Sequence, residues 1–140
     1  MILPDINILV YAHRTDSPYY LKAAKAVDWL AESISPFALC SFVCSGFLRI
    51  VTNHRIFMEP TSLSDGIQFL ESLLTLDNCR TVEPGERHWE IFSTFVKETK
   101  ATGNLISDAY LASIVVEHGL ELLTHDSDFK RFSELKICPL

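Results

Sequence analysis

The sequence predicts an α/β protein in which helices cover both faces of a mainly parallel β-sheet, a three-layer α/β/α sandwich. Short apolar runs that read as strands alternate along the chain with longer segments whose apolar residues recur at helical spacing. This alternation is typical of parallel sheets, because two parallel strands must be joined by a crossover connection, which is usually a helix. Two strand-like runs, at 2–3 and 121–124, are followed within two residues by aspartates.

The first half of the chain is expected to contain two strands and three helical segments. A strand at 2–3 is followed by a helical turn at 7–12, a helix at 19–33, a strand at 36–40 and a helix at 42–53. Ser17 and Pro18 favour a helix start, with Ser17 as N-cap and Pro18 at the first helical position. The helix at 19–33 is amphipathic, and its recurring apolar residues are Leu21, Ala24, Val27, Trp29, Leu30 and Ile34. In the next helix, the residues expected to face the core are Phe47, Leu48, Ile50 and Val51.

The second half is expected to continue the alternation. Ser64 is predicted to cap a helix with apolar residues between 67 and 76, before a strand at 80–82. A helix at 86–100 should direct Trp89, Phe92, Phe95 and Val96 inward. Ser107 is predicted to cap a helix that begins with Asp108 and ends near His118, with Gly119 as the terminating glycine. A strand at 121–124 and a weak one around Ile137 complete the sheet.

Length and composition indicate one compact domain spanning residues 1–140. The 140 residues are 48% apolar, which is enough for a sizeable core but leaves no length for a second domain. No segment approaches the roughly 18 apolar residues of a membrane span, and the amino terminus lacks a signal-peptide pattern, so a soluble, cytoplasmic protein is expected. Four cysteines without C-x-x-C spacing argue against a zinc ribbon and favour free thiols.

Four aspartates at predicted element edges are the candidate functional residues: Asp5, Asp108, Asp126 and Asp128. A carboxylate beside buried apolar sequence is costly unless it is paired, hydrogen-bonded or bound to a cation. If the strands at 2–3 and 121–124 are parallel neighbours, Asp5 and Asp126 emerge at the same edge, where open α/β sheets bind ligands. Hard oxygen ligands without sulfur or imidazole suit Mg²⁺ or Mn²⁺. The pattern points to a metal site that cleaves or transfers phosphate esters.

Each aspartate also has a purely structural explanation, and the residues alone leave it open. An acid in the first turn of a helix, as predicted for Asp108, is favoured by the macrodipole by roughly 0.3–1 kcal/mol. Asp126 and Asp128 could form a turn, and Asp5 could cap the helical turn after the first strand. Taken together, these explanations require three unrelated coincidences at one edge of a sheet.

The net charge of −6 argues at first against a nucleic-acid ligand, because phosphate contacts normally require a basic surface. Without the four aspartates the charge is −2, and bound divalent cations would reverse the sign at the site. A nucleic-acid substrate is therefore compatible with the composition. The basic residues that could flank such a site are Arg14, Lys22, Lys25, Arg49, Arg55, Lys130 and Arg131.

The chain resembles the PIN-domain superfamily and, within it, the VapC-type toxins of VapBC toxin–antitoxin modules. The resembling segments are D-I-N-I-L-V-Y-A at 5–12, G-F-L-R-I-V-T-N at 46–53, G-N-L-I-S-D-A-Y-L-A at 103–112 and L-L-T-H-D-S-D-F at 122–129. The resemblance implies a Mg²⁺- or Mn²⁺-dependent endoribonuclease with RNA as substrate, a VapB-type antitoxin as partner and a homodimeric state. It implies that the catalytic, metal-binding acids are Asp5, Asp108 and Asp126, with Asp128 as a fourth metal ligand.

The resemblance also suggests supporting roles for polar neighbours. Thr124 stands where the family tends to carry a hydroxyl, which could hydrogen-bond Asp5, and Asn7 and Asn104 could orient the acids or serve only as turn and cap residues. Water activated by the metal would attack the phosphate, so no side-chain nucleophile is required. His125 is not expected to act as the base, because neighbouring residues on a strand point to opposite faces. Arg49 could contact phosphate, pair with an acid or cover the core with its stem.

Gly46 departs from the family pattern. Many of these toxins carry an acid at this place, whereas the neighbours here, Ser45 and Cys44, are poor Mg²⁺ ligands. A water or another acid such as Glu59 could replace the missing carboxylate, and a glutamate introduced at this position is expected to be tolerated and to tighten metal binding. The alternative function is a catalytically degenerate PIN-like module that only binds protein or RNA.

Overall fold

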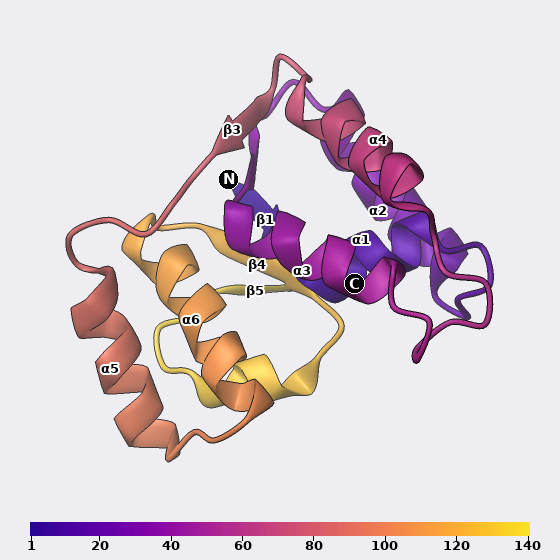
Figure 1. Ribbon diagram of the computed structural model, residues 1–140. Coiled ribbons are helices and arrows are strands. Elements are labelled where there is room, and N and C mark those ends of the chain that lie inside the picture. The colour runs from indigo at the N-terminus through magenta and orange to yellow at the C-terminus, as the bar shows by residue number, and fades with distance from the viewer.

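The computed structural model describes residues 1–140 and alternates strands with helices along the chain (Figure 1). The strands are β1 (Ile2–Pro4), β2 (Phe37–Leu39), β3 (Cys79–Thr81), β4 (Glu121–Thr124) and β5 (Ile137–Pro139). The α-helices are α1 (Ile6–His13), α2 (Tyr20–Glu32), α3 (Ser41–Val51), α4 (Leu63–Leu74), α5 (His88–Thr99) and α6 (Asn104–Glu117), and a 3₁₀-helix, η1, spans Ser127–Arg131.

Every strand pairing is parallel, as the alternation of strands and helices predicts. β4 lies between β1 and β5 in one sheet, while β2 and β3 form a second ladder beside it. Leu3 lies opposite Leu122, and the ladder continues past the end of β1, because the Asp5 backbone N–H donates to the carbonyl of Leu123. The carboxyl ends of β1 and β4 therefore meet at one edge, which confirms that the segments after them lie side by side.

Helices flank the two ladders and enclose the hydrophobic core. In Figure 1, α5 and α6 lie against each other at the lower left, α3 crosses the centre and α4 lies at the upper right. α1 follows β1 directly and packs against both α2 and α3. The core includes fully buried residues from the strands and from α1, α3 and α6, among them Leu3, Leu9, Leu39, Phe47, Ile114 and Leu122. The arrangement is an α/β fold with flanking helices around parallel strands.

The inward face of α2 differs from the prediction. The helix begins at Tyr20, and the Ser17 hydroxyl accepts a hydrogen bond from the backbone N–H of Tyr19 instead of capping the helix itself. Its buried residues are Ala23, Val27 and Leu30, which form a stripe at helical spacing against α1. Leu21, Trp29 and Ile34 are exposed. The helix carries apolar residues on two faces, and packing on α1 selects only one of them.

Three other local predictions are wrong. Ser62, not Ser64, caps α4, because its hydroxyl accepts from the Asp65 N–H. Trp89 is 72% exposed, since α5 packs on α6 through the side that carries Phe95. α6 begins at Asn104 after Gly103, whose φ of 58° is accessible to glycine without strain, so Ser107 is no cap. The helix end is as predicted, with Gly119 at φ 64°.

Two further expectations bear on the class of protein. None of the helices combines the length and the apolar composition needed to cross a bilayer. The four cysteines are free, as the absence of C-x-x-C spacing predicts.

Candidate active site

A cleft of about 340 Å³ opens at the carboxyl ends of β1 and β4. The segment between β1 and α1 forms its floor, and α6 and the start of η1 form one wall. α3 and the segment after it form the opposite wall. All four aspartates predicted from the sequence line this cleft, together with Ile6, Asn7, Phe42, Arg49, Ile50, Ile56, Asn104, Ser107, Leu111 and Phe129.

Asp5 is the most deeply buried of the four acids, with 3% of its surface exposed. Its Oδ1 accepts from the Asn7 N–H at 2.7 Å, so Asp5 is also the N-cap of α1. Its Oδ2 accepts from the Thr124 hydroxyl at 2.6 Å, which confirms the predicted hydrogen bond across the two strands. Burial raises the pKa of Asp5, while the bonds from Thr124 and Asn7 act in the opposite direction. The carboxylate is thus fixed in position by both neighbours.

Thr124 also fixes the segment that carries the next two acids. Its hydroxyl oxygen accepts from the Asp126 N–H at 3.0 Å, so one side chain joins Asp5 to the Asp126 backbone. The Asp126 Oδ1 in turn accepts from the Asp128 N–H at 2.8 Å and caps η1. The predicted turn at 126–128 is therefore real, and it presents both carboxylates to the cleft.

Asp108 lies one turn inside α6, so the macrodipole explanation for an acid in the first turn does not apply to it. It is half-buried, and no protein group donates a hydrogen bond to its carboxylate. Burial and, to a smaller extent, the negative charges of Asp126, Asp5 and Asp128 together raise the pKa of Asp108 to about 6. A carboxylate in this position lacks compensation from the protein, which a cation in the cleft would supply.

The carboxylates of Asp108, Asp126 and Asp128 lie close enough to share one ion, with one oxygen from each within 4.8 Å of the others. Asp5 lies outside this group but close enough for the charge of Asp126 to raise its pKa. Carboxylate oxygens without sulfur or imidazole are the donors that Mg²⁺ and Mn²⁺ prefer. The donor set and the mutual repulsion of the acids both fit a divalent cation.

The structure places some of the other polar candidates in the cleft and others outside it. Asn7 and Asn104 line the cleft, as does Arg49. His125 is exposed and packs on Tyr19 with ring centroids 4.5 Å apart, and it does not line the cleft. Among the seven basic residues named from the sequence, Arg49 is the one that lines the cleft, whereas Arg14 pairs with Asp16 elsewhere.

Gly46 does not line the cleft, and the predicted tolerance of a side chain there requires Ile6 to shift. A Cβ at this position would lie 2.9 Å from Cγ1 of Ile6 and closer still to its Cδ1. Ile6 thus occupies the space between α3 and the cleft. Glu59 is no substitute for the missing acid, because it is exposed on a different surface beside Arg14.

Sequence reasoning missed part of the apolar lining, namely Ile6, Phe42 and Ile56, and the place of Ser107 in the cleft. Ile6 directly follows Asp5, which was a usable signal. Phe42 and Ile56 carry no such signal, because their place in the cleft follows from how α3 and the next loop pack.

The chain belongs to the PIN domain family, whose sequence model matches residues 2–135. Within that family the similarity is to VapC proteins. The chain is 39% identical to VapC ribonuclease Mb2897 of Mycobacterium bovis over 136 residues, which are 97% of this chain and 92% of the relative. It is 35% identical to ribonuclease VapC25 of Mycobacterium tuberculosis, with 97% of this chain and 96% of the relative covered. This identity over nearly all of both chains puts the protein in the VapC branch of the family.

Solved structures share the fold. The chain superposes on a chain of VapBC2 from Rickettsia felis, bound to a promoter DNA fragment, with a TM-score of 0.72 at 19% identity, covering 99% of this chain and 98% of the other. It superposes on VapC20 of Mycobacterium tuberculosis, described as a sarcin–ricin loop cleaving toxin, with a TM-score of 0.65 at 13% identity and coverage of 97% and 99%. At these identities the comparison establishes the fold, a PIN-like α/β arrangement.

Proposed function

We propose that this protein is a Mg²⁺- or Mn²⁺-dependent endoribonuclease that acts as the toxin of a type II toxin–antitoxin system. The observation that carries the proposal is the convergence of Asp108, Asp126 and Asp128, with oxygens within 4.8 Å, beside the buried Asp5. The relatives named as VapC ribonucleases supply the substrate class, RNA. We propose residues 1–140 as a single domain.

In this proposal Asp5, Asp108 and Asp126 are the catalytic acids, and Asp128 is an additional metal ligand. Divalent ions, when bound, supply polarisation of the scissile phosphate and a water of lowered pKa. The chain supplies position: Thr124 holds the Asp5 carboxylate and the Asp126 backbone with one hydroxyl. The Asp126 carboxylate holds Asp128 in the adjoining turn. Asp108 must lose its proton to serve as a ligand, and its raised pKa of about 6 permits this at neutral pH.

A second candidate function is a PIN-like module that binds RNA or protein without cleaving. Gly46 favours it, because the position offers no carboxylate and Ile6 occupies the adjacent space. The two candidates differ in metal chemistry. Purified protein should bind Mn²⁺ in calorimetric titration and cleave RNA, and Asp5→Asn should abolish both if the nuclease proposal is correct.

Removal of the metal is the direct test of the nuclease. EDTA should abolish RNA cleavage, and added Mg²⁺ or Mn²⁺ should restore it. Undiminished cleavage in EDTA, with metal removal verified by elemental analysis, would contradict the mechanism.

The proposed partners are a VapB-type antitoxin and a second copy of the chain in a homodimer. The solved neighbours include VapBC complexes, which motivates the antitoxin. α2 exposes Leu21 (72%) and Trp29 (60%), apolar side chains that a partner helix could cover, while an Arg from the partner could reach the carboxylates. Co-expression with the adjacent upstream gene should yield a complex without ribonuclease activity. An upstream product that neither binds nor inhibits would remove the toxin–antitoxin assignment and leave the nuclease proposal intact.

A further inference from the structure

The acids of the cleft and its one arginine, Arg49, come from different elements of the fold. The four aspartates lie on the floor and on the wall formed by α6 and the start of η1. The opposite wall is formed by α3 and the loop after it, residues 52–62, and contributes Arg49, Ile50 and Ile56. No Asp or Glu occurs between Glu32 and Glu59, whereas Arg49, His54 and Arg55 fall within this stretch. Residues 33–58, which include α3 and the first part of this loop, are thus free of acids in a chain whose net charge is −6, and the next acid, Glu59, lies on the different surface beside Arg14.

Arg49 is not engaged by the protein. It is exposed, and its guanidinium forms no hydrogen bond with any protein group. The one arginine–carboxylate ion pair of the chain is Arg14 with Asp16, so no carboxylate of the cleft neutralises Arg49. Of the three roles that the sequence left open, pairing with an acid is therefore not realised. An unpaired guanidinium beside a site for phosphate esters is matched to a phosphate, which it can bind with two parallel N–H donors.

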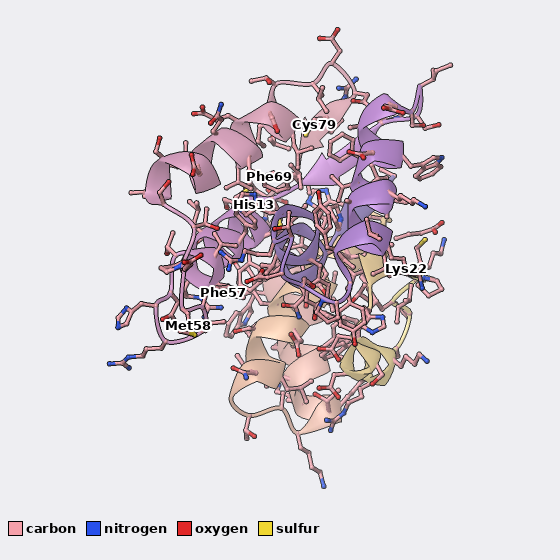
Figure 2. All side chains as sticks on the ribbon, turned by 90° about the vertical axis from the view of Figure 1, so that its right-hand side faces the viewer. His13, Lys22, Phe57, Met58, Phe69 and Cys79 are labelled. Carbon is pink, nitrogen blue, oxygen red and sulfur yellow. The ribbon has the colours of Figure 1, made fainter.

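The loop after α3 is held in place by contacts of its own. The Arg14 guanidinium donates to the Glu59 carbonyl at 2.8 Å and lies 4.0 Å above the ring centre of Phe57. The Thr61 N–H donates to the Val51 carbonyl at 2.8 Å, and the Ile56 N–H to Asn53 at 3.0 Å. Figure 2 labels Phe57 and Met58 on this loop, below His13 and Phe69 in that view. These contacts fix Ile56 at the rim of the cleft and Arg55 next to it.

We propose that the α3 wall is the surface on which the RNA strand docks, with Arg49 bound to a phosphate that flanks the scissile one. Arg55 binds the backbone further along, and Ile50 and Ile56 contact the nucleotide between them. The inference rests on the proposed ribonuclease function and assigns RNA positioning to residues outside the carboxylate cluster. Arg49 acts in substrate binding, so its loss raises KM and leaves kcat within about twofold.

The test measures RNA affinity without cleavage, in the Asp108→Asn protein. A labelled single-stranded RNA and an RNA hairpin are titrated across a range of salt concentrations, with and without Arg49→Gln. A charge-assisted hydrogen bond is worth about 1.5–3 kcal/mol, so Kd should rise roughly tenfold or more for both RNAs. The slope of log K against log salt should decrease by about 0.7–0.9, the contribution of one phosphate contact. Arg49→Lys should restore the slope and only part of the affinity, because it keeps the charge but not the two-donor fork.

Two variants serve as controls for general charge. Lys97→Gln removes one positive charge from α5, which does not line the cleft, and should leave Kd and the salt slope unchanged. Arg55→Gln should weaken binding in the same sense as Arg49→Gln, by a smaller factor. Thermal melting of each variant shows whether the fold is retained, and KM and kcat are measured in the otherwise wild-type enzyme with Mn²⁺.

The outcomes distinguish RNA docking on the α3 wall from the ribonuclease function on which that proposal rests. If the wild-type protein cleaves RNA and Arg49→Gln leaves Kd, KM and the salt slope unchanged, the docking of RNA on the α3 wall is refuted and the ribonuclease proposal is retained. An equal effect of Lys97→Gln would also refute this docking, since the effect would then report net charge. RNA binding that depends on Arg49 without any cleavage would support the docking surface and overturn the ribonuclease.

Discussion

Replacing Thr124 with Val is expected to loosen two parts of the site at once. The hydroxyl is buried, donates to Asp5 Oδ2 at 2.6 Å and accepts from the Asp126 N–H at 3.0 Å. Valine has nearly the same shape, so the substitution removes both bonds without creating a cavity. Thr124→Ser is the matched control, because it keeps the hydroxyl and loses only a methyl group.

The cost follows from the groups left without partners. A hydrogen bond to a charged group contributes about 1.5–3 kcal/mol, and a backbone N–H left unsatisfied adds a penalty of a similar order. The apolar gain from the new methyl group offsets part of this. We expect Thr124→Val to lower the free energy of unfolding by about 2 kcal/mol, which for a chain of this size lowers Tm by roughly 6 °C.

The effect should depend on pH in a defined direction. The Thr124 bond lowers the pKa of Asp5 against the raising effect of burial, so the bond stabilises the charged carboxylate more than the acid. The difference in stability between Thr124→Val and Thr124→Ser should therefore grow as pH rises through the raised pKa of Asp5. Urea unfolding in metal-free buffer at several pH values measures it. Equal stability of the two variants at every pH would refute the proposed role of the hydroxyl.

Three other changes test the carboxylates and their surroundings. Asp108→Asn should keep the fold and lose Mn²⁺ affinity and cleavage, since Asp108 accepts no protein hydrogen bond and caps no helix. If the variant unfolds but shows normal activity per folded molecule, Asp108 has a structural role instead. Mn²⁺ affinity should fall as pH decreases from 7.5 to 5, because the pKa of Asp108, raised to about 6, makes protons compete with the metal; calorimetry with equal affinity at both ends would contradict this. Gly46→Glu should destabilise the protein by about 1–3 kcal/mol through its clash with Ile6, and Ile6→Ala should relieve part of that loss in denaturant titrations; a Gly46→Glu protein as stable as wild type would show that Ile6 moves aside freely.

The positions of the acidic residues in the site could be predicted from the sequence to different degrees. Asp5 and Asp126 follow short apolar strands, and their position depends only on where each strand stops, which local sequence indicates. Asp108 was predicted at the start of its helix because Ser107 resembles an N-cap. In the structure, α6 already begins at Asn104, since Gly103 adopts a positive φ and the helix can start immediately after it.

The sequence did not indicate which face of each surface helix is buried. α2 carries apolar residues on more than one side, and α5 carries Trp89 on the side away from α6. Periodicity reports that a helix has apolar stripes but not which stripe meets a neighbour. Packing on α1 buries Val27 and leaves Trp29 exposed, and packing on α6 leaves Trp89 exposed.

The sequence by itself determined the parallel α/β class, the family and the four aspartates, because strand and helix periods, turn residues and ordered motifs are local properties of the chain. Only the tertiary structure decided that Thr124 joins Asp5 to Asp126, that Ile6 occupies the space beside Gly46, and that Arg49 lines the same cleft as the acids. Each of these contacts links segments that are distant along the chain, and their distances are set by how α1, α3 and the strands pack around one core.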